Sequence, residues 1–220
     1  MYHFDTTTPV TAVVDVAAAR VQLIAADRAD TTVEVRPADP AKARDVAAAE
    51  RTTVTFEGGV VRVVTTAEHE ILGSSGSTEV TVQLPSGSRA EVSAAALELR
   101  GVGRLGNVVV DGAACTVRLD EAASARVTTQ AGDVTIGRLG GDAEITVQKG
   151  TITVDEVARG ALALSTQAGD ISVTTAPGAS GTLDAGTAFG RISNGLRNTG
   201  EPTVTIRATT SYGDIAASAR

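Results

Sequence analysis

Three aspartates, Asp133, Asp170 and Asp214, directly follow glycines in copies of one short motif. Such recurring carboxylates could bind a cation or a cationic partner. An Asp beside a Gly more often satisfies turn amides through its own side chain, and two other copies carry Thr151 and Arg191 instead. We therefore expect a structural role, and we keep the three aspartates as candidate binding residues.

The sequence predicts neither a metal site nor a cofactor. Calcium-binding β-rolls need Gly-Gly-x-Gly-x-Asp in tandem nonapeptides, whereas Gly-Gly-Asp occurs once here, at 140–142. His69 stands between Glu68 and Glu70, but neighbours on an extended strand point to opposite faces, and no second His or Cys stands nearby. We expect His69 to belong to a solvated loop.

Cys115 is the only cysteine, so it cannot form an intramolecular disulfide. It replaces a hinge glycine, or the neighbour of one, in the repeat described below. Nucleophilic catalysis would need a nearby His, and the nearest His in sequence is 46 residues away. We expect a small buried hydrophobe.

The aromatic content argues against a carbohydrate-active enzyme. Glycoside hydrolysis needs two carboxylates at a set separation, and sugar rings are commonly held on aromatic platforms. Acids are present, but outside the N-terminal strands the aromatics are Phe56, Phe189 and Tyr212, and the last two sit beside hinge glycines, where a core role is expected. We predict no catalytic residues, with such an enzyme kept as an alternative.

Charge and hydropathy exclude two kinds of partner. The 26 acidic and 19 basic residues give a net charge of −7, which does not favour nucleic acid. The sequence contains neither a run of about 20 apolar residues nor a signal-peptide pattern. We expect no membrane insertion and a cytoplasmic protein, or an extracellular one if the chain is trimmed.

The elements that must position these residues are short repeated strands. An eighteen-residue frame runs without a gap from Arg89 to Gly178 and holds five units, and the glycines at 132, 150, 169, 190 and 213 mark its corner and two later copies. Apolar residues alternate on both sides of the corner, as in Val134 and Ile136. Period-two alternation indicates strands with one buried face, and the glycine suits a sharp corner.

These units predict an all-β, single-domain β-solenoid, a β-helix-like stack of coils of about 18 residues. A unit this short cannot bury its apolar face alone, but stacked copies about 4.8 Å apart can. An antiparallel β-sandwich is the alternative, because it also has short strands with regular turns. Within one domain, 1–220, we expect N-terminal coils with an insertion and a hairpin (1–88), regular repeats (89–178) and longer terminal coils (179–220).

The N-terminal part contains recognisable local signals. Strands are expected at 13–16, 20–25 and 31–36, and a hairpin is expected from Thr52–Phe56 and Val60–Thr65 around two glycines. A helix is the expectation for Asp39–Glu50, with Asp as its cap and Pro at its first position. A polar loop follows at Ala67–Ser77.

Glutamines recur at one phase of the repeat. Gln130, Gln148 and Gln167 each stand two residues before a hinge glycine. Side-chain amides at one phase of a stack can form a ladder, as in cross-β arrangements. We predict such a structural amide ladder.

The repeated Gly-Asp-Val/Ile step, the turns beginning at Arg104 and Arg138, the segment Leu84–Ser88 and the closing Thr210–Ile215 resemble a bacterial β-strand-repeat family of unknown function labelled "putative adhesin". The likeness extends from Phe4 to Ile215, and the Arg-rich, Ala-rich composition resembles an actinobacterial member. The resemblance implies a stack of β-coils with no catalytic residues to carry over.

The sequence closes five residues after the last Gly-Asp-Ile, at Arg220. Solenoid ends need covering, because a bare coil presents unpaired backbone and apolar surface. We expect the C-terminal coil to be covered either by the N-terminal strand folding back or by a second molecule. The second case means self-association, as a homodimer or an end-to-end assembly.

The leading functional hypothesis is a non-enzymatic binding or scaffold module for a protein partner. The alternative is a surface adhesin-like protein exported by unseen means.

Overall fold

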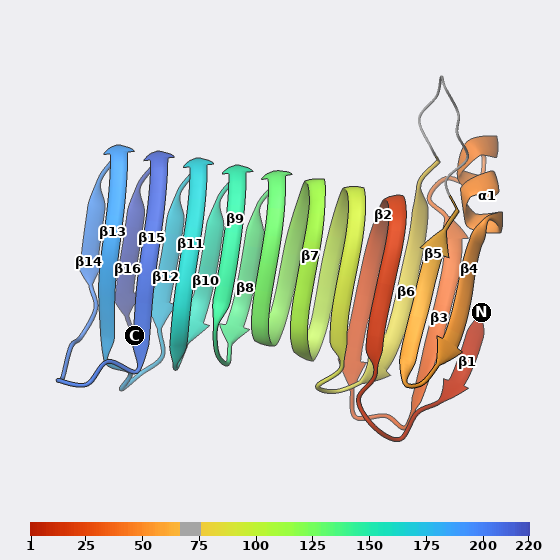
Figure 1. Ribbon diagram of the computed structural model, residues 1–220, viewed down its shortest axis with the longest axis horizontal. Coiled ribbons are helices and arrows are strands. Elements are labelled where there is room, and N and C mark those ends of the chain that lie inside the picture. The colour runs from red at the N-terminus through yellow and green to blue at the C-terminus, as the bar shows by residue number, and fades with distance from the viewer. Residues whose placement is uncertain (67–75) are drawn as a thin grey trace.

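The computed structural model describes residues 1–66 and 76–220, and Figure 1 shows its strands lying side by side along the longest axis of the molecule. These described residues form sixteen strands in one sheet that winds into successive coils. In chain order the elements are β1 (Tyr2–Asp5), β2 (Thr11–Ala26), β3 (Asp30–Pro37), α1 (Ala43–Glu50), β4 (Thr52–Glu57), β5 (Val60–Thr65), β6 (Thr78–Pro85), β7 (Arg89–Ala131), β8 (Val134–Leu139), β9 (Ala143–Lys149), β10 (Ile152–Val157), β11 (Gly160–Ala168), β12 (Ile171–Thr175), β13 (Gly181–Phe189), β14 (Ile192–Gly195), β15 (Val204–Tyr212) and β16 (Ile215–Ala219).

Parallel pairing between successive coils confirms the β-solenoid and excludes the antiparallel sandwich. β8 pairs with β7 and β10, and β9 pairs with β7 and β11, all in parallel. The paired residues are one coil apart in sequence, as in Val134 with Ile152. β7 is a single 43-residue strand that bends through consecutive coils, so the strand names do not coincide with the coils.

Small aliphatic side chains fill the interior of the stack in columns. One such column lies at the start of the second leg, immediately after the corner, and its members in five coils are buried: Val117, Val134, Ile152, Ile171 and Ile215. Each member meets the equivalent residue of the next coil at the spacing of hydrogen-bonded strands, about 4.8 Å. The alternation seen in the sequence therefore places one residue of each pair in this core and its neighbour on the surface.

The N-terminal end of the stack has a cap of antiparallel strands. β4 pairs with β5, β3 with β6, and β1 with β3, all antiparallel. Phe4 and Phe56 pack against each other there, with ring centroids 5.1 Å apart. Figure 1 shows α1 beside these strands, at the end of the stack where the chain begins.

The predicted hairpin and helix are both present in this cap. β4 and β5 form the hairpin. The helix begins at Ala43, later than the predicted Asp39, because the Asp39 carboxylate accepts the Ala41 N–H in a turn that precedes it. His69 and most of the expected loop at Ala67–Ser77 lie outside the described residues; Ser77 donates its N–H to the buried Asp45 carboxylate at 2.9 Å.

The order of coils in space differs from their order in sequence at both ends. β2 lies between β7 on one side and β5 and β6 on the other, so the first coil is internal. β15 lies between β11 and β13, and β16 between β12 and β14. β13 and β14 therefore do not pair with β11 and β12, which precede them in the chain. The last two strands, β15 and β16, lie between these two pairs.

This order corrects the expectation for the C-terminal coil. The sequence frame suggested that the last coil in the chain would be the last coil in space. The structure instead covers it with β13 and β14 of the same chain, and the N-terminal strand β1 pairs with β3 at the opposite end. The coil that ends the stack is therefore the β13–β14 coil.

The hinge glycines form a column in which successive coils approach each other closely. Gly169 has φ +150°, which side-chain-bearing residues rarely adopt, and a Cβ placed on it would lie 2.0 Å from the carbonyl oxygen of Gly150. The same contact recurs along the column, from Gly213 to Gly169 and from Gly190 to Gly213. The corner therefore needs glycine both for its backbone conformation and for the space that a side chain would fill.

We predict that Gly169→Ala lowers the free energy of unfolding by about 2–4 kcal/mol, because it adds backbone strain and a clash with a carbonyl of the next coil. Gly186→Ala is the matched control: Gly186 has no positive φ, and a Cβ there would meet nothing within 4 Å. The control should change stability by no more than about 0.5 kcal/mol. Urea denaturation of both variants measures the difference, and equal effects would contradict this account of the corner.

Candidate functional site

The three candidate aspartates lie at one corner of the stack, where each caps an amide of the neighbouring coil. Oδ1 of Asp133 accepts the N–H of Thr151 at 2.8 Å, and Oδ1 of Asp170 accepts the N–H of Asp214 at 2.7 Å. Oδ1 of Asp214 accepts the N–H of Arg191 at 2.8 Å. The bonded amide belongs to the next coil in space rather than to the residue's own turn.

These bonds define what the corner carboxylates can do chemically. An oxygen of each is engaged with backbone, and Asp214 also binds the guanidinium of Arg191 at 2.8 Å. No group of three or more His, Cys, Asp or Glu side chains in the described residues is arranged to hold a metal ion. The geometry assigns the corner carboxylates to holding coils together.

A threonine three residues before the hinge glycine completes the corner. Its hydroxyl donates to a corner carbonyl of the adjacent coil: Thr166 to Gly150 at 3.1 Å, and Thr210 to Gly169 at 3.1 Å. Val147 occupies the equivalent place in the intervening copy and cannot make this bond. The repeated Thr-x-x-Gly-Asp motif thus makes three kinds of contact between coils. The threonine hydroxyl donates a hydrogen bond, the glycine allows the close approach, and the aspartate carboxylate accepts a hydrogen bond.

The predicted glutamine ladder does not form. Gln130, Gln148 and Gln167 are all exposed, and no hydrogen bond joins these side chains, which belong to the described part of the chain. The prediction was wrong because the amides project from the stack into water, where solvent competes for every donor and acceptor.

Cys115 is fully buried, as expected, at the position that precedes Gly132 in the corner column. Burial raises the pKa of its thiol above the ordinary value, and this outweighs the opposing hydrogen bond with Thr129. The thiolate is the nucleophilic form, so this environment disfavours reactivity. The residue acts as a small core side chain.

The expected core role of Phe189 and Tyr212 is wrong. Their rings stack against each other, with centroids 5.0 Å apart and planes 5° from parallel, yet the residues are 65% and 60% exposed. Each residue comes after the last inward-facing position of its strand and before the hinge glycine. Its side chain therefore points away from the core. They form an exposed aromatic pair beside the β13–β14 end.

The first legs of three neighbouring coils present a polar surface that we call the hydroxyl-amide face. It consists of the outward residues of β7 and β9 that alternate with buried ones, namely Asn107, Val109, Asp111, Arg126, Thr128, Gln130, Glu144, Thr146 and Gln148. Thr128 pairs in register with Thr146, and Arg126 with Glu144. The alternation of outward and buried residues in the sequence contains the signal for this face.

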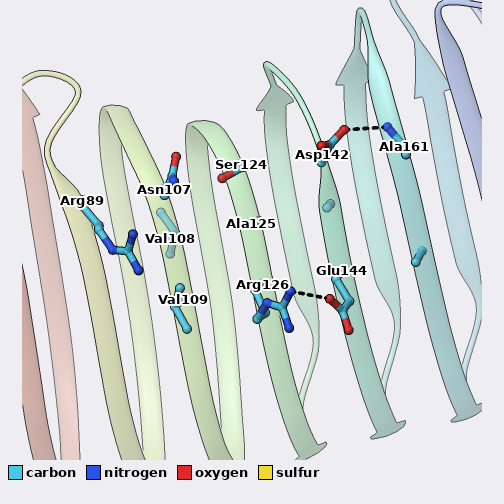
Figure 2. A pocket seen from close by; sticks show the side chains of 12 residues that line it. Arg89, Asn107, Val108, Val109, Ser124, Ala125, Arg126, Asp142, Glu144 and Ala161 are labelled. Atoms are coloured by element: carbon cyan, nitrogen blue, oxygen red, sulfur yellow. Dashed lines mark hydrogen bonds and ion pairs between the residues drawn. The ribbon is translucent and has the colours of Figure 1, made fainter.

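Two hollows lie along the hydroxyl-amide face. The first, of ≈ 430 Å³, is lined by Arg89, Asn107, Arg126 and Glu144 among others, and Figure 2 shows these side chains standing on adjacent strands. Arg126 and Glu144 form an ion pair at 2.7 Å, so their charges are balanced. The second hollow, of ≈ 520 Å³, is lined by residues of the same strands farther along, including Thr128, Gln130, Thr146 and Gln148.

The remaining surfaces carry charge in paired columns. Arg20 contacts Glu79 and Glu98 from the two neighbouring coils, at 2.7 and 3.0 Å. Arg138 and Arg220 both contact Glu156, at 3.1 and 2.9 Å. These exposed pairs link coils and largely neutralise one another, and each contributes little to stability.

The described residues therefore form a β-solenoid of stacked parallel coils, one face of which carries hydroxyl, amide and charged side chains. None of its helices is long and apolar enough to cross a membrane, within the residues described. The chain belongs to the Toastrack DUF4097 family, whose model matches residues 12–220. No curated protein matches the sequence.

Solved structures resemble this chain to different degrees. A putative adhesin from Bacteroides fragilis has a TM-score of 0.59 at 12% identity, covering 98% of this chain and 95% of that one. A putative cell adhesion protein from Clostridium sporogenes (TM-score 0.34, 8% identity, 98% and 94% covered) and a putative adhesin from Parabacteroides distasonis (0.36, 12%, 98% and 95%) are more distant. At these identities the first likeness supports the fold alone. The expected adhesin-type family is confirmed.

The contacts of Asp214 make its titration a test of the corner. The Arg191 backbone N–H, and then its guanidinium, hold the pKa of Asp214 below the ordinary value of 3.8. Because the folded-state pKa is lowered, the stabilisation is present above pH 3.8 and is lost as the pH falls through the lowered pKa. We predict an NMR titration midpoint below 3.8 for the Asp214 carboxyl.

Arg191→Ala removes the guanidinium but keeps the backbone N–H. The midpoint of Asp214 should therefore move part of the way back to its ordinary value. Identical midpoints in the variant and the parent would show that the ion pair contributes nothing in solution.

Proposed function

We propose that the protein is a non-enzymatic binding module whose hydroxyl-amide face holds an extended, uncharged, hydroxyl-rich polymer of the polysaccharide class. The observation that carries the proposal is the pair of adjoining hollows on one strand face. Thr128, Gln130, Thr146 and Gln148 line the second hollow, and no hydrogen bond within the described residues engages these side chains. Their donors and acceptors are available to a ligand.

The chemistry of the face favours this class of ligand over others. A nucleic acid would need a basic surface, whereas the chain carries a net charge of −7 and both arginines in the first hollow are paired, Arg126 with Glu144 and Arg89 with Glu91. Peptides are usually held by apolar grooves or by an open sheet edge, and this face lies in the middle of the sheet. The face has no aromatic platform for a sugar ring, so the proposed contacts are hydrogen bonds between the hydroxyls of the polymer and the hydroxyls and amides that recur on neighbouring strands about 4.8 Å apart.

A second candidate is an adhesin-like role at a cell surface. The likeness to the putative adhesin from Bacteroides fragilis favours it. A polymer-binding face is compatible with such a role and with the cytoplasmic location expected from the sequence. Fractionation of the native cell, followed by immunodetection, distinguishes the two locations.

Two double variants of the same coils test the proposed face. Thr128→Val with Thr146→Val removes two hydroxyls from the hydroxyl-amide face while it keeps the shape of both side chains. Thr135→Val with Thr153→Val makes the same change on the other leg, where these threonines also pair in register. We expect the first double variant to weaken binding by about tenfold or more, since each hydrogen bond contributes about 1 kcal/mol, and the second to leave it unchanged.

Binding is measured by isothermal titration calorimetry against a panel of soluble neutral polysaccharides. Equal effects of the two double variants would overturn the assignment of the face. An absence of binding to every neutral polysaccharide, together with binding to a charged one, would overturn the proposed ligand class.

A further inference from the structure

The β13–β14 coil ends the stack with both of its outer edges open. β13 pairs only with β15, and β14 pairs only with β16, within the residues that the structure describes. The connection to β15 covers one place, where Arg197 accepts the N–H of Gly181 at 2.8 Å. The rest of the β13 edge is available to another strand.

The inner column of the core is uncovered at this end. Ile215 is 1% exposed, whereas Ile192, its register partner on the outermost coil, is 47% exposed. Leu183 and Ala185 on β13 are only partly buried against the core. An apolar column that the stack covers elsewhere thus meets solvent here.

The edge of the nine-residue strand β13 lacks the lysines and prolines that usually protect an edge against pairing. Natural edges carry Lys, Pro or inward-pointing charges, which prevent the addition of another strand. Residues 181–195 contain neither Lys nor Pro, and their only charged residues are Asp184 and Arg191. Each is paired with the coil behind it, Asp184 with Arg207 at 3.3 Å and Arg191 with Asp214 at 2.8 Å.

The opposite end of the stack has a different structure. There the core of β5 and β6 is covered by β4, β3 and β1, and Val61 and Val82 are fully buried. A head-to-tail contact would therefore join an open edge to a capped one. A contact between two open ends is possible through a two-fold axis, which brings the same edge of each copy together in antiparallel pairing.

We propose that the β13–β14 end binds the same end of a second copy of this chain, forming a closed dimer in which β13 pairs antiparallel with its own counterpart. The two-fold contact buries the open end of both copies. No open end then remains to which a third chain could add, so the assembly stops at two chains. The paired backbone groups and the covered apolar column supply the stabilisation that each end lacks alone.

The position of Asp184 selects the register of this contact. Pairing centred on Asp184 would place two like charges directly opposite, which is destabilising. Pairing centred on Ala185 places Asp184 opposite Gly186 and Leu183 opposite Thr187, so that inward-facing residues stay on the core side. The dimer is therefore expected to bring the two copies of Ala185 face to face.

The first test is the mass of the full chain by light scattering and sedimentation, from low micromolar to the highest soluble concentration. Twice the mass of the chain is expected. Ile192→Lys adds a charge to the open end at a half-exposed position, and should raise the dimer dissociation constant by about tenfold or more. Tyr2→Lys, at an exposed position of the opposite end, is the matched control and should leave it unchanged.

The second test does not depend on the fold tolerating a lysine. Ala185→Cys should form an intermolecular disulfide under mild oxidation, while the parent, whose only thiol is the buried Cys115, should not. A strict monomer throughout the concentration range would overturn the proposal, as would a dimer that Tyr2→Lys dissociates and Ile192→Lys does not. Open-ended growth would overturn the closed two-fold arrangement.

Discussion

The structure depends on the close approach of neighbouring coils at the hinge glycines. At Gly132, Gly150 and Gly169 a Cβ would lie 2.0–2.2 Å from a carbonyl oxygen of the adjacent coil. This approach lets the corner N–H groups donate across the coils, as Gly150 does to Ala168 at 2.9 Å. Sheet pairing therefore continues into the corner, and the flanking strands on both legs stay in register.

The same constraint determines which polar groups remain available for function. Threonines and aspartates at the corner bond to backbone of the neighbouring coil, and arginines and glutamates on the charged surfaces bond to one another. The groups left to interact with another molecule stand between the corners, where the strands themselves satisfy the backbone. Function is therefore expected on strand faces and at the open end of the stack, rather than at the motif that repeats most clearly.

Much of the fold was predictable because repetition constrains local structure. Alternation and the hinge glycines predicted strands, corners and their stacking, and the two glycines after Phe56 predicted the β4–β5 hairpin. The order of coils at the ends was not predictable, because the eighteen-residue repeat gives the order of units along the chain and not the position that each unit takes in the stack. The orientation of Phe189 and Tyr212 was missed for a local reason: the parity of the strand changes just before the corner, so neighbours of the glycine point outward.

The five aromatic residues show how stacking limits the chemistry of this protein. Tyr2, Phe4 and Phe56 belong to β1 and β4, and Phe189 and Tyr212 to β13 and β15, so every aromatic side chain lies near an end of the stack. The described middle coils repeat a thin core of Val, Ile, Leu and Ala, and a large ring in one coil would have to fit against its neighbours about 4.8 Å away on both sides. Rings are accommodated where a neighbour is missing, as in the antiparallel cap, or where the chain leaves the core, as at the exposed pair. The outer faces of the middle coils therefore carry short polar side chains beside paired charges and no aromatic ring, which favours many weak hydrogen bonds along an extended ligand over one deep pocket.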